Sequence, residues 1–227
     1  MTQTKRLICL ANSRKLSGRC IAGIEFVANS PSGWVRPVSS REHEEVSEDE
    51  RQYENGSDPR VLDLIDVPLL RRIPKAYQQE NWLLDPEKYW VKVGQIQLAD
   101  LTAMAEKTGP LWINGHSTYH GQNDSIPEQQ AQTFRSSLQL IEVDDLALRV
   151  FAPGSAFGDL KRRVQGRFTF SSVQYALWVT DPAIERQYKA MEDGTYNAGR
   201  CFLTISIGEV HKGVCYKLIA AVILKGS

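Results

Sequence analysis

The chain has 227 residues, of which 42% are hydrophobic and 24% are charged, and its 27 basic residues balance 27 acidic ones. A chain of this length and ordinary globular composition can bury a sizeable core, so it does not need disulfides to fold. The net charge of zero argues neither for nor against a nucleic-acid partner.

The four cysteines form no CxxC pair, which excludes the usual zinc spacing. They lie in apolar runs, which indicates buried free thiols in a reducing compartment. No apolar run is long enough to span a membrane, and the first one is too short for the core of a signal peptide. We therefore expect a cytoplasmic protein with no membrane partner and no cofactor.

The first third of the chain predicts a small β-structure with one acidic helix. A turn-rich loop is expected at 12–18, and the segment 41–58 holds eight acidic residues against two arginines, a net charge of −6. Within that segment, Ser47 followed by Glu50 fits a capping box and Gly56 fits a helix end. The strands are predicted at 5–11, 19–26, 33–38 and 61–70.

The middle of the chain, residues 76–135, predicts a partly helical connector. Asp85 followed by Pro86 fits a helix start. A polar loop with two glycines follows at 114–124. Between them, apolar residues recur at helical spacing at positions 98, 101, 104 and 105.

The last third has the clearest pattern. A helix begins at Asp181 and Pro182, after three strands and before two. This order is that of the OB-fold, a five-stranded barrel. We predict a mainly β (α+β) chain with OB-like barrels at 1–75 and 136–227, although no fifth strand can be located in the first barrel. The strand segments are predicted at 137–143, 146–151, 161–170, 173–180, 201–207 and 214–224, with a break at Asp144 and Asp145.

The hairpin at 161–180 carries the strongest binding signal. Because strand side chains alternate between faces, its apolar residues can fill a barrel while Arg163, Arg167 and Trp178 face outward. OB-folds bind oligonucleotides across this part of the barrel, where arginine suits phosphates and tryptophan suits bases. The alternative is a solvated polar face with a half-buried tryptophan.

The first 40 residues are basic, with a net charge of +5, and Trp34 and Arg36 share one face of a strand. The loop 12–18 lies where OB-folds place a ligand-contacting loop, and its polar residues suit phosphate contacts. A basic rim that balances the acidic helix explains the same charges equally well.

Three enzyme interpretations are weaker. His116 and His120 have metal-ligand spacing for a helix, but neighbouring glycines disfavour a helix there. Asp63 and Asp66 would point to opposite faces of a strand, so they would not share an ion with Glu80. Cys9 or Cys20 with His43 could form a nucleophile pair, but a cysteine buried in an apolar strand is inert by default. No phosphate-binding or nucleophile motif is present, and we expect a non-enzymatic protein.

Several long strings resemble the bacterial dual OB-containing domain family. They include LICLANSRK, GWVRPVS, NGHSTYHGQND and YALWVTDPAIE, and the resemblance runs from Arg6 to Leu224. It implies two OB-folds that bind nucleic acid or nucleotides, with a link to immunity or stress systems. The ligand-contacting positions that it implies are Asn12, Ser13, Arg14, Arg19, Trp34, Arg36, Asn114, Ser117, Tyr119, Asn123, Arg163, Arg167 and Trp178.

Three functions stay open at this point. The first is binding of single-stranded nucleic acid on the arginine and tryptophan face. The second is a sensor for a nucleotide or small ligand between the barrels, suggested by the polar loop at 114–124. The third is an adaptor for a protein partner, with the barrel edges and the acidic helix as its contacts. The polar loop has a structural alternative as well, since its side chains can pin the middle segment to a barrel.

Overall fold

The computed structural model describes residues 2–28 and 30–225. The chain forms two compact units, which are described separately. Unit 1 comprises Met1–Met104 and Arg135–Ser137, and unit 2 comprises Ala105–Phe134 and Leu138–Ser227. Among the described helices, none is both long and apolar enough to cross a membrane.

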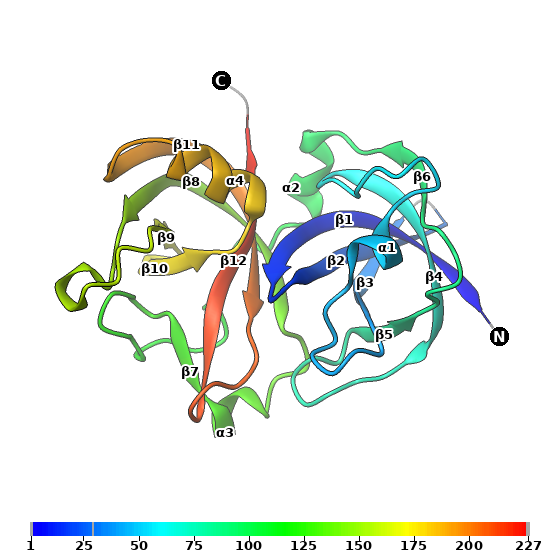
Figure 1. Cartoon of the computed structure of the whole chain (residues 1–227), viewed down its shortest axis with the longest axis horizontal. Helices are drawn as coiled ribbons and strands as arrows, with labels where there is room; N and C mark the ends of the chain where they lie inside the picture. Colours follow the sequence, from blue (N-terminus) through cyan, green and yellow to red (C-terminus); the bar gives the residue numbers. More distant parts are fainter. Residues whose placement is uncertain (1, 29, 226–227) are drawn as a thin grey trace. The chain divides into compact units, whose positions relative to one another are not determined.

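Unit 1 is a five-stranded OB barrel (Figure 1). Its strands are β1 (Gln3–Lys15), β2 (Gly18–Val27), β3 (Ser30–Val38), β4 (Asp63–Arg72) and β5 (Asn81–Leu84). They follow the order β1-β2-β3-β5-β4, and β4 pairs back with β1, so the sheet closes. β3 and β5 run parallel, and the one-turn helix α1 (Glu48–Arg51) lies between β3 and β4 in the chain. The strand β6 (Val91–Gln95) pairs antiparallel with β4 as an additional strand of the sheet. The short helices η1 (Leu98–Asp100) and α2 (Leu101–Met104) follow β6 in the chain.

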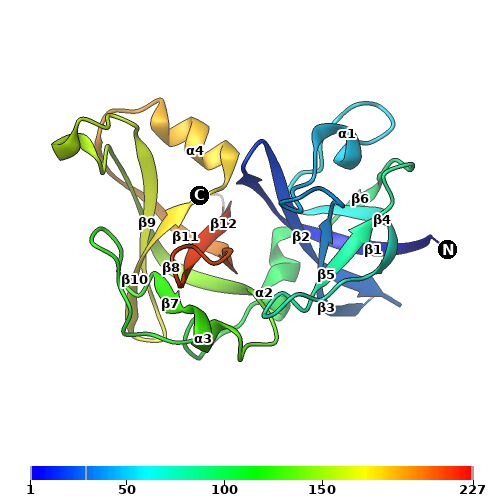
Figure 2. The same cartoon turned by 60° about the horizontal axis from the view of Figure 1, so that its bottom comes forward.

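Unit 2 repeats this topology. Its barrel strands are β8 (Leu138–Phe151), β9 (Arg163–Phe170), β10 (Val173–Val179), β11 (Gly194–Ile207) and β12 (Val214–Leu224). They follow the order β10-β9-β8-β11-β12, and parallel pairing of β10 with β12 closes the ring. The helix α4 (Pro182–Lys189) covers one end of the barrel (Figure 2), where Ile184 and Tyr188 join the core. The shorter elements are β7 (Ser125–Pro127), α3 (Glu128–Ala131) and η2 (Ser155–Phe157).

The predicted fold class is therefore confirmed, and so are the predicted helix positions around Ser47 and Asp181. Ser47 and Glu50 form the expected capping box. Asp181 caps α4 by accepting hydrogen bonds from the backbone of Ala183 and Ile184. α1 is shorter than expected, because it ends at Arg51, well before Gly56.

The fifth strand of the first barrel is β5, which lies inside the segment expected to be a connector. Residues 76–104 and 135 of that segment belong to unit 1 and residues 105–134 belong to unit 2, so the segment is not a separate connector between the barrels. Asp85 does not begin a helix, because it follows the end of β5 and its carboxylate accepts a turn hydrogen bond from Glu87 N at 3.2 Å. The expected boundary at residue 75 therefore differs from the structure.

Two predicted interruptions are continuous strand instead. Residues 12–15 extend β1 in register with β2, so the turn shrinks to Leu16 and Ser17. Asp144 and Asp145 lie within β8, where both are exposed. The register of β8 with β11 shifts at this point, from Leu146 opposite Gly199 to Val143 opposite Cys201, so the two aspartates lie at an irregularity of the ladder.

Candidate nucleic-acid interface

The polar loop at 114–124, called the strap below, fills the gap between two barrel strands of unit 2. β10 and β12 pair at only two positions. Next to them, Gln122 and Ala176 exchange backbone hydrogen bonds of 3.2 and 3.0 Å, and Lys217 N donates to Asp124 O at 2.8 Å. The strap therefore completes the barrel wall where the strands diverge.

Most predicted binding residues of the strap hold its own shape. Asn123 Oδ1 accepts from Gly115 N at 2.7 Å, and Ser117 Oγ accepts from Asn123 N at 2.9 Å. Asn114 Oδ1 accepts from Tyr175 OH at 2.9 Å. The structure therefore places Asn114, Ser117 and Asn123 in internal hydrogen bonds.

Two further residues define the strap tip. The buried Asp124 accepts from the backbone N and the hydroxyl of Thr118, at 2.8 and 2.5 Å, and so closes the loop. Tyr119, at the tip, is 94% exposed. Of the four strap residues predicted to contact a ligand, Tyr119 is the one whose large side chain projects into solvent.

The outer face of β8, β9 and β10 carries three arginines. Strand register places Arg149 opposite Gln165, and Gln165 opposite Trp178. Residues opposite each other in a sheet share a face, so these three point outward together. Arg163 and Arg167 lie on the same face of β9, two residues to either side of Gln165. The inward face of the hairpin belongs to the barrel core, which confirms the predicted alternation.

Aromatic rings and two of these arginines form a continuous stack on this face. The guanidinium of Arg149 lies 4.2 Å from the centroid of the Phe151 ring. Phe151 stacks on Trp178 at 5.7 Å between centroids, and Arg163 lies 3.9 Å from the Trp178 ring. His120 of the strap contacts both rings edge-on, at 5.5 and 6.5 Å. Each cation therefore rests on an aromatic surface.

Trp178 is on the predicted face, but its indole is not open to solvent. The side chain is only 9% exposed because Phe151, Arg163 and His120 surround it. The expectation of an outward indole available for a base is therefore wrong. Tyr119 is the exposed aromatic group beside it, with its ring 4.7 Å from His120.

Gln165 connects the strap to the arginine face. It is fully buried, and its Nε2 donates to His120 O at 2.7 Å. Its Oε1 accepts from Arg167 Nε at 3.1 Å, which orients that guanidinium. Within 2–28 and 30–225, neither Arg149 nor Arg167 forms an ion pair with a carboxylate. No described carboxylate therefore lies within ion-pair distance of either guanidinium, although Arg167 lines a pocket together with Asp144 and Asp145.

A pocket of about 450 Å³ lies beside this stack. Pro153 contributes from the loop after β8, and Gly208 and Glu209 contribute from the loop between β11 and β12. Those are the two loops, between strands one and two and between strands four and five, that bind ligands in OB-folds. The remaining wall comes from the strap tip, Arg163, Trp178 and β12.

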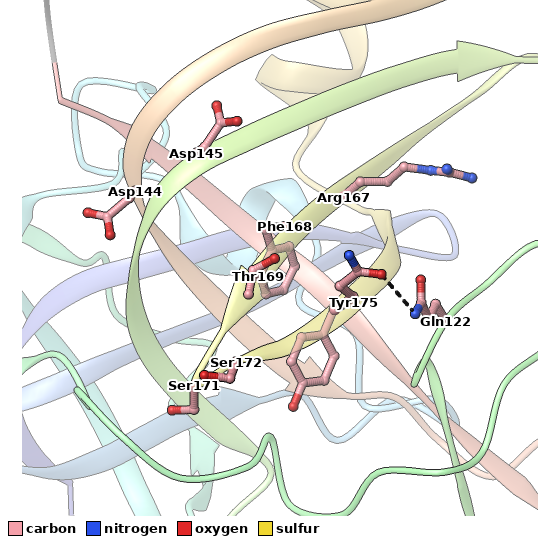
Figure 3. Close-up of a pocket in the computed structure, with 10 residues that line it drawn as sticks. Gln122, Asp144, Asp145, Arg167, Phe168, Thr169, Ser171, Ser172 and Tyr175 are labelled. Atoms are coloured by element: carbon pink, nitrogen blue, oxygen red, sulfur yellow. Dashed lines mark hydrogen bonds between the residues drawn. The ribbon is translucent and has the colours of Figure 1, made fainter.

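A second, more polar pocket of about 540 Å³ lies at the other end of the hairpin (Figure 3). Asp144 and Asp145 line it together with hydroxyl and amide groups, among them Ser171 and Ser172 of the hairpin turn. Figure 3 shows the side chain of Arg167 extending away from the two aspartates. Their carboxylates repel anions, so they mark the end of the cationic face.

The family model of the dual OB-containing domain matches residues 5–222. The chain belongs to this family. No curated protein and no solved structure matches the chain significantly. A dual OB-containing domain is built from folds that bind ligands on the outer barrel face and its loops, which is where the arginine face lies.

Among its described residues, the first barrel of this dual OB-containing domain has no comparable face. Its equivalent cross-strand row is apolar, with Ile8 opposite Ile24 and Ile24 opposite the half-buried Trp34. Arg36 is 4% exposed, pairs with Glu80 at 3.4 Å and donates to Ser137 Oγ at 2.7 Å. Burial beside a carboxylate makes this guanidinium inaccessible to a ligand, although its Nε has no hydrogen-bond partner among the described residues.

The remaining predicted residues of the first barrel lie along the β1–β2 hairpin. Asn12 Nδ2 donates to Pro59 O at 2.8 Å, and Ser13 Oγ donates to Cys20 O at 3.2 Å. Arg19 forms a backbone bridge with Val46, while Arg14 is exposed near the turn. The structure does not bring these groups together with Trp34 and Arg36 into one site.

The cysteines and histidines of the dual OB-containing domain do not assemble a reactive cluster. Burial and the nearby charge of Asp63 raise the pKa of Cys9 to about 12, so its thiol stays protonated in neutral solution. Burial likewise raises the pKa of Cys201 to about 12. In the part of the chain that the structure describes, no three metal-ligating side chains come together.

Proposed function

We propose that the second barrel binds single-stranded nucleic acid across the outer face of β8, β9 and β10, in a binding role without catalysis. The observation that carries the proposal is the pair Arg149 and Arg167, which lack acid partners within the described chain and flank an aromatic stack. Guanidinium groups neutralise phosphates and release counterions, while aromatic rings stack on bases. Both kinds of group lie on the face that OB-folds use for oligonucleotides.

The distribution of charge on this face suggests the direction in which the nucleic-acid strand crosses it. Asp144 and Asp145 repel phosphates at one end of the hairpin. The backbone therefore passes from Arg167 toward Arg149 and Arg163, and the exposed ring of Tyr119 receives a base beside them. Stacking on a side chain requires an unpaired base, which favours a single strand over a duplex.

A second candidate is a sensor that binds one nucleotide in the pocket beside Trp178. The pocket volume of about 450 Å³ lies within the range of small-ligand sites, and the rings of Tyr119 and Tyr216 in its wall suit a base. The two candidates differ in their dependence on ligand length. A mononucleotide site gains nothing from a longer strand, whereas a strand site gains affinity with each phosphate contact.

The test is a fluorescence anisotropy titration of the full chain with a labelled mixed-sequence oligonucleotide of about twelve nucleotides at low salt. We expect the variant carrying Arg149→Ala and Arg167→Ala to bind at least about tenfold more weakly, because two phosphate contacts are lost. Arg186→Ala removes an exposed arginine on α4 and is the matched control. Absence of binding at tens of micromolar, or an equal loss in the control, would falsify the proposal.

A further inference from the structure

The pocket beside Trp178 combines aromatic walls with one acidic group. Trp178, Tyr119 and Tyr216 line it, and of its described lining residues only Glu209 carries a carboxylate. Glu209 lies on the loop between β11 and β12. That loop is closed by hydrogen bonds from Gly208 N to Tyr216 O and from His211 N to Val214 O, both 2.8 Å. The loop therefore presents its acidic residue from a defined backbone.

A carboxylate discriminates among bases because it only accepts hydrogen bonds. Guanine offers two adjacent N–H donors on its Watson–Crick edge, and a carboxylate accepts both. Adenine and cytosine offer one amino group, while thymine and uracil place their single N–H between two carbonyl oxygens that a carboxylate repels. A carboxylate has about four acceptor positions, so Glu209 can accept from a base while keeping its contact within the chain.

Arg163 supplies the complementary polar group. Its guanidinium is held over Trp178 and lines the same pocket as Glu209. Guanine carries acceptors at O6 and N7, and arginine is the side chain that most often contacts them. An acceptor from Glu209 and donors from Arg163 together match guanine better than the other bases.

We propose that this pocket receives one guanine of the bound strand, with Glu209 accepting from its Watson–Crick edge. The inference rests on the proposed function, because it assigns base selectivity to the strand site. It adds a residue, Glu209, that does not contribute to phosphate binding. The strand as a whole is then bound with little sequence preference, except at this one position.

The test compares all-thymine strands of about twelve nucleotides with strands carrying a single guanine, adenine or cytosine. We expect the single guanine to raise affinity about tenfold over thymine, which is typical of a bidentate base contact. Glu209→Gln replaces one acceptor by a donor, so the ratio of guanine to thymine affinity should fall close to one. Glu192→Gln makes the same change at an exposed glutamate after α4, outside the pocket, and should leave that ratio unchanged.

A thermal shift of the full chain with GMP and UMP gives a second readout. Equal affinity for all four strands, with the dependence on Arg149 and Arg167 intact, overturns the guanine pocket and leaves the proposed function standing. Stabilisation by GMP that Glu209→Gln removes, without binding of any strand, supports the pocket and overturns the strand site. No response to strands or mononucleotides overturns both.

Discussion

The guanidinium carbon of Arg163 lies 3.9 Å from the ring centroid of Trp178, although the two residues are on different strands. Arg163 is opposite Phe151 and Trp178 is opposite Gln165, so they are diagonal neighbours on one sheet face. The contact covers the indole with a cation instead of leaving it for a base. Trp178 thus supports the arginine face from beneath, and the exposed ring of Tyr119 is the surface that a ligand meets first.

Substitution of Trp178 should therefore reduce stability, whereas substitution of Tyr119 should reduce binding. Trp178→Ala removes a side chain that is 9% exposed, and we expect the free energy of unfolding to fall by about 3–5 kcal/mol. Tyr119→Ala should change it by no more than about 0.5 kcal/mol and weaken oligonucleotide binding instead. Guanidinium chloride unfolding and anisotropy measure the two properties. A destabilised Tyr119→Ala protein, or a fully stable Trp178→Ala protein, would reverse the assignment.

The salt dependence of binding should report the individual phosphate contacts. A plot of log Kobs against log salt has a slope of about −0.7 per neutralised phosphate for single strands. Arg149→Ala should therefore make the slope less negative by about 0.7, and Arg167→Ala should do the same. Arg186→Ala, on α4, is the control for loss of a surface charge. A slope unchanged in the first two variants would show that these arginines do not contact phosphates.

The order of elements and the alternation in the 161–180 hairpin could be predicted because both are local signals. β5 could not be located, since it has four residues and no apolar alternation. Its antiparallel pairing with the preceding strand β4 and its parallel pairing with the distant strand β3 define it as a strand. Such a short strand can therefore be recognised from its pairing in the closed barrel, but not from its local sequence pattern.

Only part of the candidate site could be predicted, because some of its features are local in the sequence and others depend on distant residues. The outward positions of Arg163 and Arg167 follow from strand period, but the burial of Trp178 depends on His120, which precedes it by more than fifty residues. Arg149 was missed, although its alternation with Leu148 and Val150 on a strand was a usable signal. Arg36 was assigned to a ligand because it shares a strand face with Trp34. Its partner Glu80 lies in the segment expected to be a connector, so nothing local in the sequence indicated the ion pair.

Gly23 should be essential to the first barrel. A Cβ at this position would lie 2.3 Å from the backbone oxygen of Ile8 on the paired strand, so β1 would have to move. We expect Gly23→Ala to lower the free energy of unfolding by about 1–3 kcal/mol, the usual cost of overpacking. Gly33→Ala is the matched control in the same barrel, because a Cβ there meets nothing within 4 Å. Equal thermal stabilities of the two variants would contradict this role.

Lys217 should make stability rise with pH in the alkaline range. Its side chain is fully buried, and its ammonium donates to Ile113 O and lies 5.4 Å from the ring centroid of Tyr175. Burial lowers the pKa of Lys217 to about 8, while the charge of Asp124 acts in the opposite direction. Above about pH 8 the unfolded chain holds a proton that the folded chain has released, so the free energy of unfolding increases with pH until the unfolded lysine also titrates.

Below about pH 8 the lysine is protonated in both states, and the folded state carries the cost of a buried charge. We expect the difference in unfolding free energy between the native chain and Lys217→Met to shift by about 2 kcal/mol in favour of the native chain from pH 7.5 to pH 9.5. Urea unfolding at several pH values measures this difference. Lys161→Met, at an exposed lysine of the same unit, controls for loss of one positive charge. A difference that shifts toward Lys217→Met as pH rises would mean that burial does not lower the pKa of Lys217.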